Sequence, residues 1–404
     1  MKNIILFVII SLMLICCKEE GRVDHIDTSG VAPPQVTITG NRKIPGGAVL
    51  KYTLPEDTTL LYVQAEYEIR PGVKRETKSS YLKDSLVMEG FGEARQYDVK
   101  IYSVGKNRKA SEPLSVTIET GVPPVLMASK SIRETFGGIA IDIENPERTN
   151  LAVVLLGDTA NHGYFSELYT FYTSMPKITF KYRGLDSIPY EFGVYLRDRW
   201  NNLSDTVIVS SLTPWFEEYI TKPWFDYPLD GDHQPIPLVY GDWGLHRIWD
   251  EETAGDAGFH GEETKELPSI ITWDLGKKVK LCRFTLYTRN ADYGSDDRWE
   301  RGHPRLFEVY GSLAPNPNGV LDKTWIPLGS FECVKPSGPG RQVTQEDLDA
   351  VRDGFEYDFD ITDFAPEPQS VVRYIRFVTR ETFAYSPIST VHINEISFWG
   401  SFVD

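Results

Sequence analysis

Residues 270–287 read IITWDLGKKVKLCRFTLY, and this stretch determines which fold we expect for the C-terminal part of the chain. From Cys282 to Leu286 apolar and polar residues alternate, which is typical of a half-buried strand. The same pattern continues in residues 307–312 (FEVYGS), 373–377 (RYIRF) and 393–400 (INEISFWG). Strands of this kind, joined by long polar loops, predict an antiparallel jelly roll.

Upstream of this stretch the sequence contains an internal repeat. The repeated positions are Gly46, Gly47, Pro55, Leu60, Tyr97 and Ser111 in the first copy, and Gly137, Gly138, Pro146, Leu151, Tyr190 and Ser204 in the second. Both copies alternate with period 2, as in residues 61–67 and 190–196, and neither holds a long helical stripe. Copies of about 90 residues built from short strands have the size of an immunoglobulin-like sandwich.

Both parts of the chain resemble known families. The strand at Tyr97, Ser111 and the strand that ends at Thr120 resemble the end of a fibronectin type III module. The C-terminal part resembles the discoidin, or coagulation factor type C, family. The resemblance rests on WDLG at 273–276, FEVYGS at 307–312, Trp325, RYIR at 373–376 and EISFWG at 395–400, in that order.

These resemblances imply an all-β fold with two immunoglobulin/fibronectin-like sandwiches, followed by a galactose-binding-like jelly roll. We expect a fibronectin type III-like module at residues 34–121, a second one at 122–214 and a discoidin-like module at 223–404. The long stretch 336–354 departs from the family pattern and is interpreted as an additional loop. The three-module arrangement is similar to that of surface lipoproteins encoded in polysaccharide-utilisation loci.

The N-terminus has the features of a secreted lipoprotein. Lys2 precedes an apolar run at residues 4–15, which is shorter than the ~20 residues that span a bilayer. The run ends LICC, which resembles the bacterial lipoprotein box and places the acylated residue at Cys17. We therefore expect a signal peptide at residues 1–17, a tether at 18–33 and a lipid-anchored protein exposed on the outer membrane. A short uncleaved anchor is the alternative interpretation.

The charge of the chain and its cysteine content bear on two further questions: whether it binds nucleic acid and whether it contains disulfides. The net charge of −16 argues against nucleic acid as a partner, because a phosphate backbone needs a basic face. Only Cys282 and Cys333 lie outside the N-terminal segment, so a disulfide framework is not expected. Two interpretations remain for this pair: one disulfide in an oxidising compartment, or two buried thiols.

Two loops of the C-terminal module contain the residue types that bind sugars. Aromatic rings stack on the apolar faces of sugars, while polar side chains bind the hydroxyl groups. Trp243, Tyr293 and Trp299 are the candidate stacking residues, and the candidate polar contacts are His246, Arg289, Asn290, Asp292 and Arg298. The alternative is that Trp243 and Trp299 close the ends of the sandwich as core residues. Trp273, Trp325 and Trp399 fall within strands and are interpreted as core.

The resemblance also implies a structural calcium site. Asp250 in an early loop and Glu395 on the closing strand occupy positions comparable to the family's ligands, and calcium takes six to eight oxygens. An ordinary solvated acidic loop is the alternative interpretation, and the Asp-Gly turn usual at such sites is missing.

We expect binding rather than catalysis. The sequence lacks the nucleophile-elbow, zinc-protease, phosphate-loop and dinucleotide motifs. The first hypothesis is a non-catalytic surface lipoprotein that captures polysaccharide, with the two sandwiches as spacers and with neighbouring proteins of an uptake complex as partners. The second is a protein-interaction or adhesion component. The third is a glycoside hydrolase, because acidic pairs such as Asp296-Asp297 are abundant.

Overall fold

The computed structural model describes residues 28–159, 162–237, 241–255, 258–263, 266–290, 297–300, 302–340, 342–359, 370–384 and 390–404. The expected signal peptide, the lipidation site Cys17 and most of the tether lie outside these residues. Among the helices of the described ranges, none combines the length and the apolar character that a bilayer-spanning helix needs.

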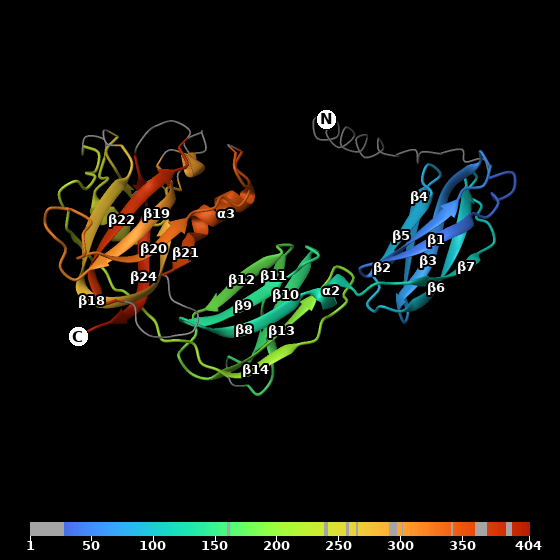
Figure 1. The fold of residues 1–404 in the computed structure, drawn as a ribbon, viewed down its shortest axis with the longest axis horizontal. Coiled ribbons are helices and arrows are strands. Elements are labelled where there is room, and N and C mark those ends of the chain that lie inside the picture. The colour runs from blue at the N-terminus through green and yellow to red at the C-terminus, as the bar shows by residue number, and fades with distance from the viewer. Residues whose placement is uncertain are drawn as a thin grey trace, which may run out of the picture. The chain divides into compact units, whose positions relative to one another are not determined.

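The expected all-β fold is confirmed (Figure 1). The first sandwich consists of β1 (Thr37–Ile44), β2 (Gly47–Thr53), β3 (Leu60–Arg70), β4 (Val73–Ser80), β5 (Ser85–Glu89), β6 (Gln96–Gly105) and β7 (Leu114–Glu119). After the short helix α2 (Pro124–Met127), the second sandwich consists of β8 (Ser129–Thr135), β9 (Gly138–Glu144), β10 (Leu151–Gly157), β11 (Ser166–Thr173), β12 (Lys177–Arg183), β13 (Tyr190–Arg197) and β14 (Val207–Leu212).

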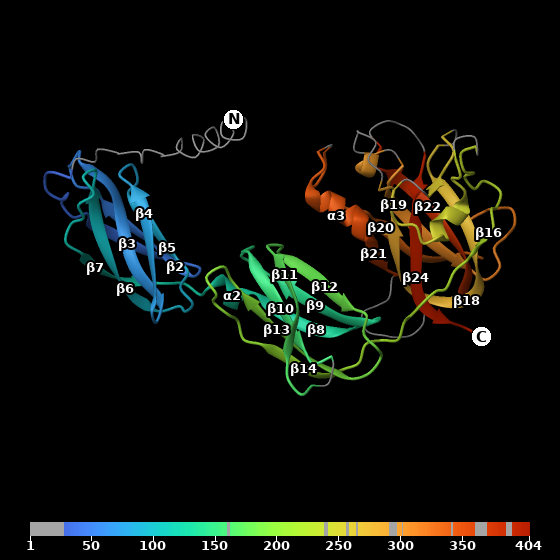
Figure 2. The same cartoon turned by 180° about the vertical axis from the view of Figure 1, so that it is seen from behind.

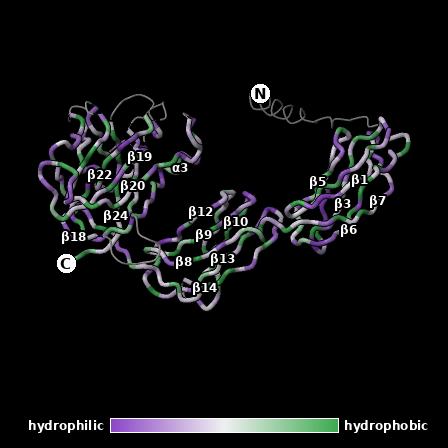
Figure 3. The backbone as a smooth tube through the Cα atoms, viewed as in Figure 1, coloured by the Kyte–Doolittle hydropathy of each residue, from purple (hydrophilic) through white to green (hydrophobic). Residues whose placement is uncertain are grey.

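The two sandwiches share one topology, as the internal repeat predicts. The first pairs its strands in the orders β1-β2-β5 and β4-β3-β6-β7, and the second in the equivalent orders β8-β9-β12 and β11-β10-β13-β14. The backbone conformation of the repeated glycines is also the same: Gly46 has φ of +61° and Gly137 has φ of +60°. The hydropathy colouring of Figure 3 follows the alternation of polar and apolar residues along these strands. In the first sandwich this alternation buries one face of each sheet in a shared core.

The C-terminal module contains the remaining elements. These are β15 (Glu218–Tyr219), β16 (Phe225–Asp226), η2 (Leu245–Trp249), β17 (Phe259–His260), β18 (Ser269–Tyr287), η3 (Asp297–Trp299), β19 (Pro304–Ser312), β20 (Ile326–Glu332), α3 (Gln345–Asp353), β21 (Phe355–Asp358), β22 (Val372–Thr382), β23 (His392–Ile393) and β24 (Glu395–Phe402). In both Figure 1 and Figure 2, α3 lies beside β20 and β21.

Residues 270–287 lie in β18, a strand of 19 residues that belongs to both layers of the jelly roll. Its first half pairs with β16 and β22, and β22 continues through β19 to β20. Its second half pairs with β21 and β24, and β24 continues to β15. Because β15 pairs with β24, residues 218–219 belong to the jelly roll, although we expected that module to begin at 223.

Aromatic side chains fill the space between these two layers. Trp273 and Phe284 of β18 are fully buried, and Phe284 lies 5.9 Å from Phe398 of β24 between ring centroids. Trp325 is also buried, as expected. The expectation that Trp399 is a core residue is wrong, because its ring faces outward and lies 3.7 Å from the guanidinium of Arg283.

Cys282 and Cys333 do not form a disulfide. Both are buried free thiols. The Cys282 thiol donates to a carboxylate oxygen of Glu217 at 3.3 Å, and the Cys333 sulfur lies 3.3 Å from Nε2 of His303. Burial raises the pKa of Cys333 to about 12 and also raises that of Cys282. Both thiols therefore stay protonated at neutral pH and act as small apolar core residues.

A buried ion pair stabilises the outer face of the β22 layer. Arg376 and Asp232 are 1% and 2% exposed, and their side chains approach to 3.0 Å. The guanidinium also donates to the hydroxyl of Thr272 at 3.1 Å and to the carbonyl of Gly319 at 2.6 Å. Through these three bonds Arg376 ties the loops that contain Asp232 and Gly319 to the sheet.

Replacing this arginine tests its role. Removing one partner of a buried ion pair leaves an uncompensated charge, so Arg376→Met should lower the free energy of unfolding by about 3–5 kcal/mol. Arg380→Met is the matched control, because Arg380 pairs with Glu308 at the surface, where such pairs contribute about 1 kcal/mol or less. Urea denaturation of both variants measures the difference, and equal losses would contradict this role for Arg376.

Candidate functional site

One end of the jelly roll brings two of the expected sugar-binding residues together. Trp243 and Arg289 line the same small hollow, although 46 residues separate them in sequence. The other lining residues are Gly258, Phe259, His260, His392 and Asn394. Trp243 comes from the loop before η2, and Arg289 follows the end of β18. The hollow therefore forms where several loops meet at one end of the module.

The histidines come together through a very short ladder. Strands β17 and β23 contain two residues each, and their pairing places His260 opposite His392. The imidazole centroids lie 3.8 Å apart, and the ring of Trp243 meets His260 edge to face at 5.7 Å. Gly258 leads into this ladder with φ of +155°, and a Cβ there would lie 2.6 Å from the carbonyl oxygen of Ile393. Only glycine fits so close to the neighbouring strand.

Trp243 is the only one of the three candidate stacking residues that the structure leaves partly exposed within the described ranges. Its ring folds back over its own loop. The indole nitrogen lies so close to Gly241 that a Cβ added there would be only 2.7 Å from it. A partly exposed indole beside an arginine and an asparagine offers an apolar surface together with hydrogen-bond donors. Tyr293 and Asp292 lie outside the described residues, so these two predictions stay untested.

The expectation that Trp299 stacks on a ligand is wrong. Trp299 is 1% exposed, and its indole nitrogen donates to the carbonyl of Asp347 at 3.1 Å. Phe355 and Phe383 meet its ring at 5.6 and 5.0 Å, and His303 stacks on it at 4.5 Å. The alternative interpretation, a core residue that closes the sandwich, is therefore confirmed for Trp299.

The stretch expected as an additional loop explains this burial. Residues 345–353 form α3, whose N-terminus carries a capping box between Thr344 and Asp347. The Asp347 carboxylate is fully buried and also accepts from the backbone N–H and the hydroxyl of Ser337, at 2.9 and 2.7 Å. These bonds anchor the insertion over Trp299.

The other candidate polar residues do not line the hollow. His246 is exposed, and its Nε2 lies 3.2 Å from a carboxylate oxygen of Asp242 on the same loop. Asn290 pairs through its backbone with Gly255. Arg298 offers its carbonyl to Nδ1 of His303 at 2.6 Å. The sequence analysis missed His260, His392 and Asn394, and their ladder is too short to leave a period-2 signal.

The residues at the implied calcium site do not fit an ion. Glu395 is 1% exposed, and one of its carboxylate oxygens accepts a hydrogen bond from the ammonium of Lys222. The other oxygen accepts from the backbone N–H of Glu251 at 2.9 Å. Asp250 pairs instead with Arg247 at 2.7 Å. Within the described residues there is also no group of three His, Cys, Asp or Glu side chains placed to hold a metal.

The positive charge next to the Glu395 carboxylate comes from Lys222. Its ammonium lies 5.6 Å from the ring centroid of Tyr219 and 5.5 Å from that of Trp224, within the range of a cation–π contact. Burial raises the pKa of Glu395 to about 7, although Lys222 acts in the opposite direction. The ammonium of Lys222, from the segment before β16, thus occupies the place beside Glu395 at which the resemblance implies a calcium ion.

Metal removal tests this arrangement. We expect the melting temperature of the full chain to be the same in excess EDTA and in excess calcium chloride. Lys222→Met should lower the free energy of unfolding by about 3–5 kcal/mol, because it leaves Glu395 buried without its partner. The exposed Lys278→Met serves as the control. A melting temperature that falls with EDTA would show that an ion is bound after all.

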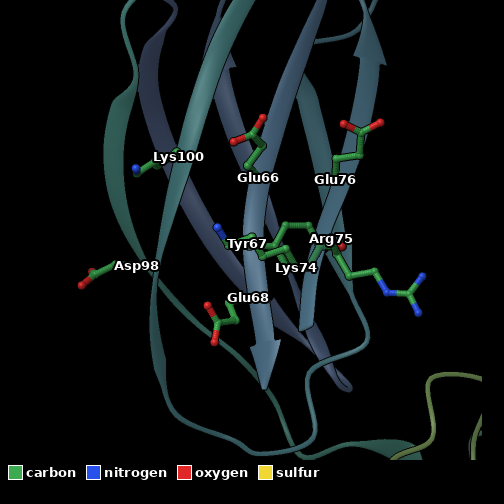
Figure 4. A pocket seen from close by; sticks show the side chains of 8 residues that line it. All are labelled: Glu66, Tyr67, Glu68, Lys74, Arg75, Glu76, Asp98 and Lys100. Atoms are coloured by element: carbon green, nitrogen blue, oxygen red, sulfur yellow. The ribbon is translucent and has the colours of Figure 1, made fainter. Parts of the chain in front are cut away.

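A broader hollow lies on the first sandwich, on the outward face of β3, β4 and β6 (Figure 4). Strand pairing places Glu66 between Glu76 and Lys100, so acids and bases share this face. Of the described residues that line it, Tyr67 alone is aromatic, and it is 8% exposed. Because no exposed ring lines the hollow itself, we assign it no ligand.

Comparison with known proteins divides the chain into three segments. Residues 33–120 match the family described as domain of unknown function DUF4959, residues 121–223 match DUF5126, and residues 249–400 match DUF5000, also described as a domain of unknown function. No curated protein matches the chain.

Solved structures with similarity to the chain include a SusE-like protein, BT2857, with 27% identity over 70% of this chain and 100% of that one, at a TM-score of 0.41. The module CBM32-3 of a family 31 glycoside hydrolase from Clostridium perfringens has 15% identity over 44% of this chain and 91% of that one, at a TM-score of 0.31. A two-domain fibronectin type III segment of chicken tenascin has 14% identity over 45% of this chain and 99% of that one, at 0.20.

Proposed function

We propose that this protein is a non-catalytic carbohydrate-binding protein, and that it binds sugar at the Trp243 end of the jelly roll. The observation that carries this proposal is the hollow in which a partly exposed indole lies beside Arg289, His260, His392 and Asn394. The hollow itself, at about 10 Å³, is far smaller than the ~300–1,000 Å³ of an enclosed ligand site, so the sugar would lie against the exposed face of the indole, with these polar groups beside it.

The chemistry of the hollow favours binding over hydrolysis. Glycoside hydrolysis ordinarily needs two carboxyl groups on either side of the scissile bond. Among the described residues that line the hollow there is no Asp or Glu. The carboxylate of Glu263 lies 3.9 Å from Nε2 of His260 and is mostly exposed. We therefore assign no catalytic role to this end of the module.

The location that we propose follows from the N-terminal sequence. Acylation at Cys17 would attach the protein to the outer membrane, and the tether and the two sandwiches would hold the jelly roll away from the lipid surface. A binding protein in this position would deliver polysaccharide to neighbouring proteins of an uptake complex.

Substitution at the hollow tests the sugar site. Affinity gel electrophoresis against neutral polysaccharides identifies a ligand, and calorimetry then measures its affinity. Trp243→Ala should weaken binding at least tenfold, equivalent to ~1.4 kcal/mol, because the stacking surface is lost. Trp299→Ala should lower the melting temperature instead, because Trp299 is a core residue.

Tyr81→Ala is the matched control, since Tyr81 is an exposed aromatic residue of the first sandwich. It should leave both affinity and stability unchanged. Failure of every neutral polysaccharide to bind, or unchanged affinity in Trp243→Ala, would refute the proposed site.

A further inference from the structure

The second sandwich carries an open hollow on one face of its four-stranded sheet. The hollow has a volume of about 310 Å³ and is lined by Asn150, Ala152, Tyr172, Arg197, Asp198 and Asn201, among others. Its volume falls at the lower end of the ~300–1,000 Å³ typical of small-molecule sites. All these residues belong to this one sandwich: three lie on β10, β11 and β13, which are labelled in Figure 1, and the others lie on the adjoining loops.

Strand register explains how the hollow forms. Ala152 on the central strand β10 pairs with Tyr172 on β11 and with Arg197 on β13. Residues directly opposite one another project from the same face of a sheet. The alanine therefore forms a low floor, with an aromatic side chain on one side of it and an arginine on the other.

The first sandwich shows that this hollow is not a property of the fold. The repeat places Leu61 at the position of Ala152 and Val104 at the position of Arg197. The structure supports the second match, because Val104 forms an isolated bridge with Ala110 as Arg197 does with Leu203. In the first copy Val104 pairs with Tyr62, and Leu61 falls at an irregularity of the pairing, so a larger residue occupies the place of the alanine and no arginine is present.

The side chains at the hollow are available to a ligand. Tyr172 is 76% exposed. Arg197 is half-buried, yet within the described part of the chain its guanidinium has no recorded hydrogen bond or ion pair. The side-chain amides of Asn150 and Asn201 are exposed and likewise make no recorded hydrogen bond to a described residue.

The one carboxylate at the hollow is already engaged. Asp198 is buried, and one of its oxygens accepts from the backbone N–H groups of Trp200 and Asn202 at 2.8 and 2.9 Å. Its other oxygen accepts from the side-chain amide of Asn202 at 2.9 Å. These bonds hold Asp198 in its own turn. A second arginine, Arg199, also lines the hollow, but its guanidinium pairs with Glu89 at 3.0 Å. Arg197 is therefore the cationic group that the hollow offers to an anionic ligand.

We propose that this hollow binds an acidic sugar, with the ring of the sugar on Tyr172 and its anionic group on Arg197. A guanidinium binds a carboxylate through two parallel hydrogen bonds, and a phenol ring offers a face for stacking. Asn150 and Asn201 supply donors and acceptors for hydroxyl groups. The ligand class is a polysaccharide that contains uronic acid residues. This site is separate from the jelly-roll hollow and does not depend on it.

Calorimetry on the full chain tests this inference with three probes: oligogalacturonate, a sulfated galactan oligosaccharide and a neutral galactan oligosaccharide. We expect oligogalacturonate to bind, with an affinity that falls as the salt concentration rises. Tyr172→Ala, Arg197→Gln and Ala152→Leu should each weaken it at least tenfold. Ala152→Leu fills the space above the central strand, so it removes the hollow without removing a polar group.

Tyr164→Ala is the matched control, because Tyr164 is 64% exposed on the same module but does not line the hollow. The Tyr164→Ala variant should bind oligogalacturonate with the affinity of the unmodified chain. Thermal unfolding checks that every variant is folded. Binding of the sulfated probe alone would overturn the assignment to uronic acid. Absence of acidic-sugar binding, or binding that the three variants leave unchanged, would overturn the site.

Trp243→Ala separates this inference from the proposed function. If it alone abolishes oligogalacturonate binding, the jelly roll holds the acidic sugar and the present inference is wrong. If Tyr172→Ala abolishes that binding while no neutral polysaccharide binds anywhere, the inference stands and the proposed function fails.

Discussion

The structure of the C-terminal module depends on one strand that takes part in both layers of its sandwich. The pairing of β18 with β22 breaks between Asp274 and Val279, and beyond this break the strand pairs with β24. Gly276 makes the turn between the two halves with φ of +75°, and its N–H donates to the carboxylate of Asp274 at 2.7 Å. A side chain at Gly276 would lie 2.8 Å from the ring of Phe225, so the crossing requires glycine.

The position of the candidate site follows from this crossing. The second half of β18 ends at Tyr287, and the chain continues directly to Arg289 at the hollow. The carbonyl of Tyr287 accepts from the N–H of Asn394 at 2.9 Å, which brings the start of β24 to the same end of the module. Rigid strands thus hold a site whose side chains come from loops, an arrangement common in binding proteins.

Much of this architecture could be predicted from sequence, because it depends on local pattern. Period-2 alternation predicted the strands, and the duplicated residues predicted two sandwiches of the same topology. The site was predicted only in part. The burial of Trp299 was not predictable, because the polar residues of α3, which covers it, resemble a loop in sequence. The partner of Glu395 was not predictable either, because Lys222 lies 173 residues away in sequence. His260 and His392 meet through strands of two residues, too short to recognise by alternation.

The central claim, that sugar binds at the Trp243 end of the jelly roll, is tested most directly by the indole N–H signals in an NMR titration of the full chain. The chain has nine tryptophans, and each gives its own indole signal. On addition of a neutral oligosaccharide that binds, the account predicts that the Trp243 signal shifts progressively while those of the buried Trp273 and Trp299 stay in place. A titration in which the sugar binds and the Trp243 signal does not move would contradict it.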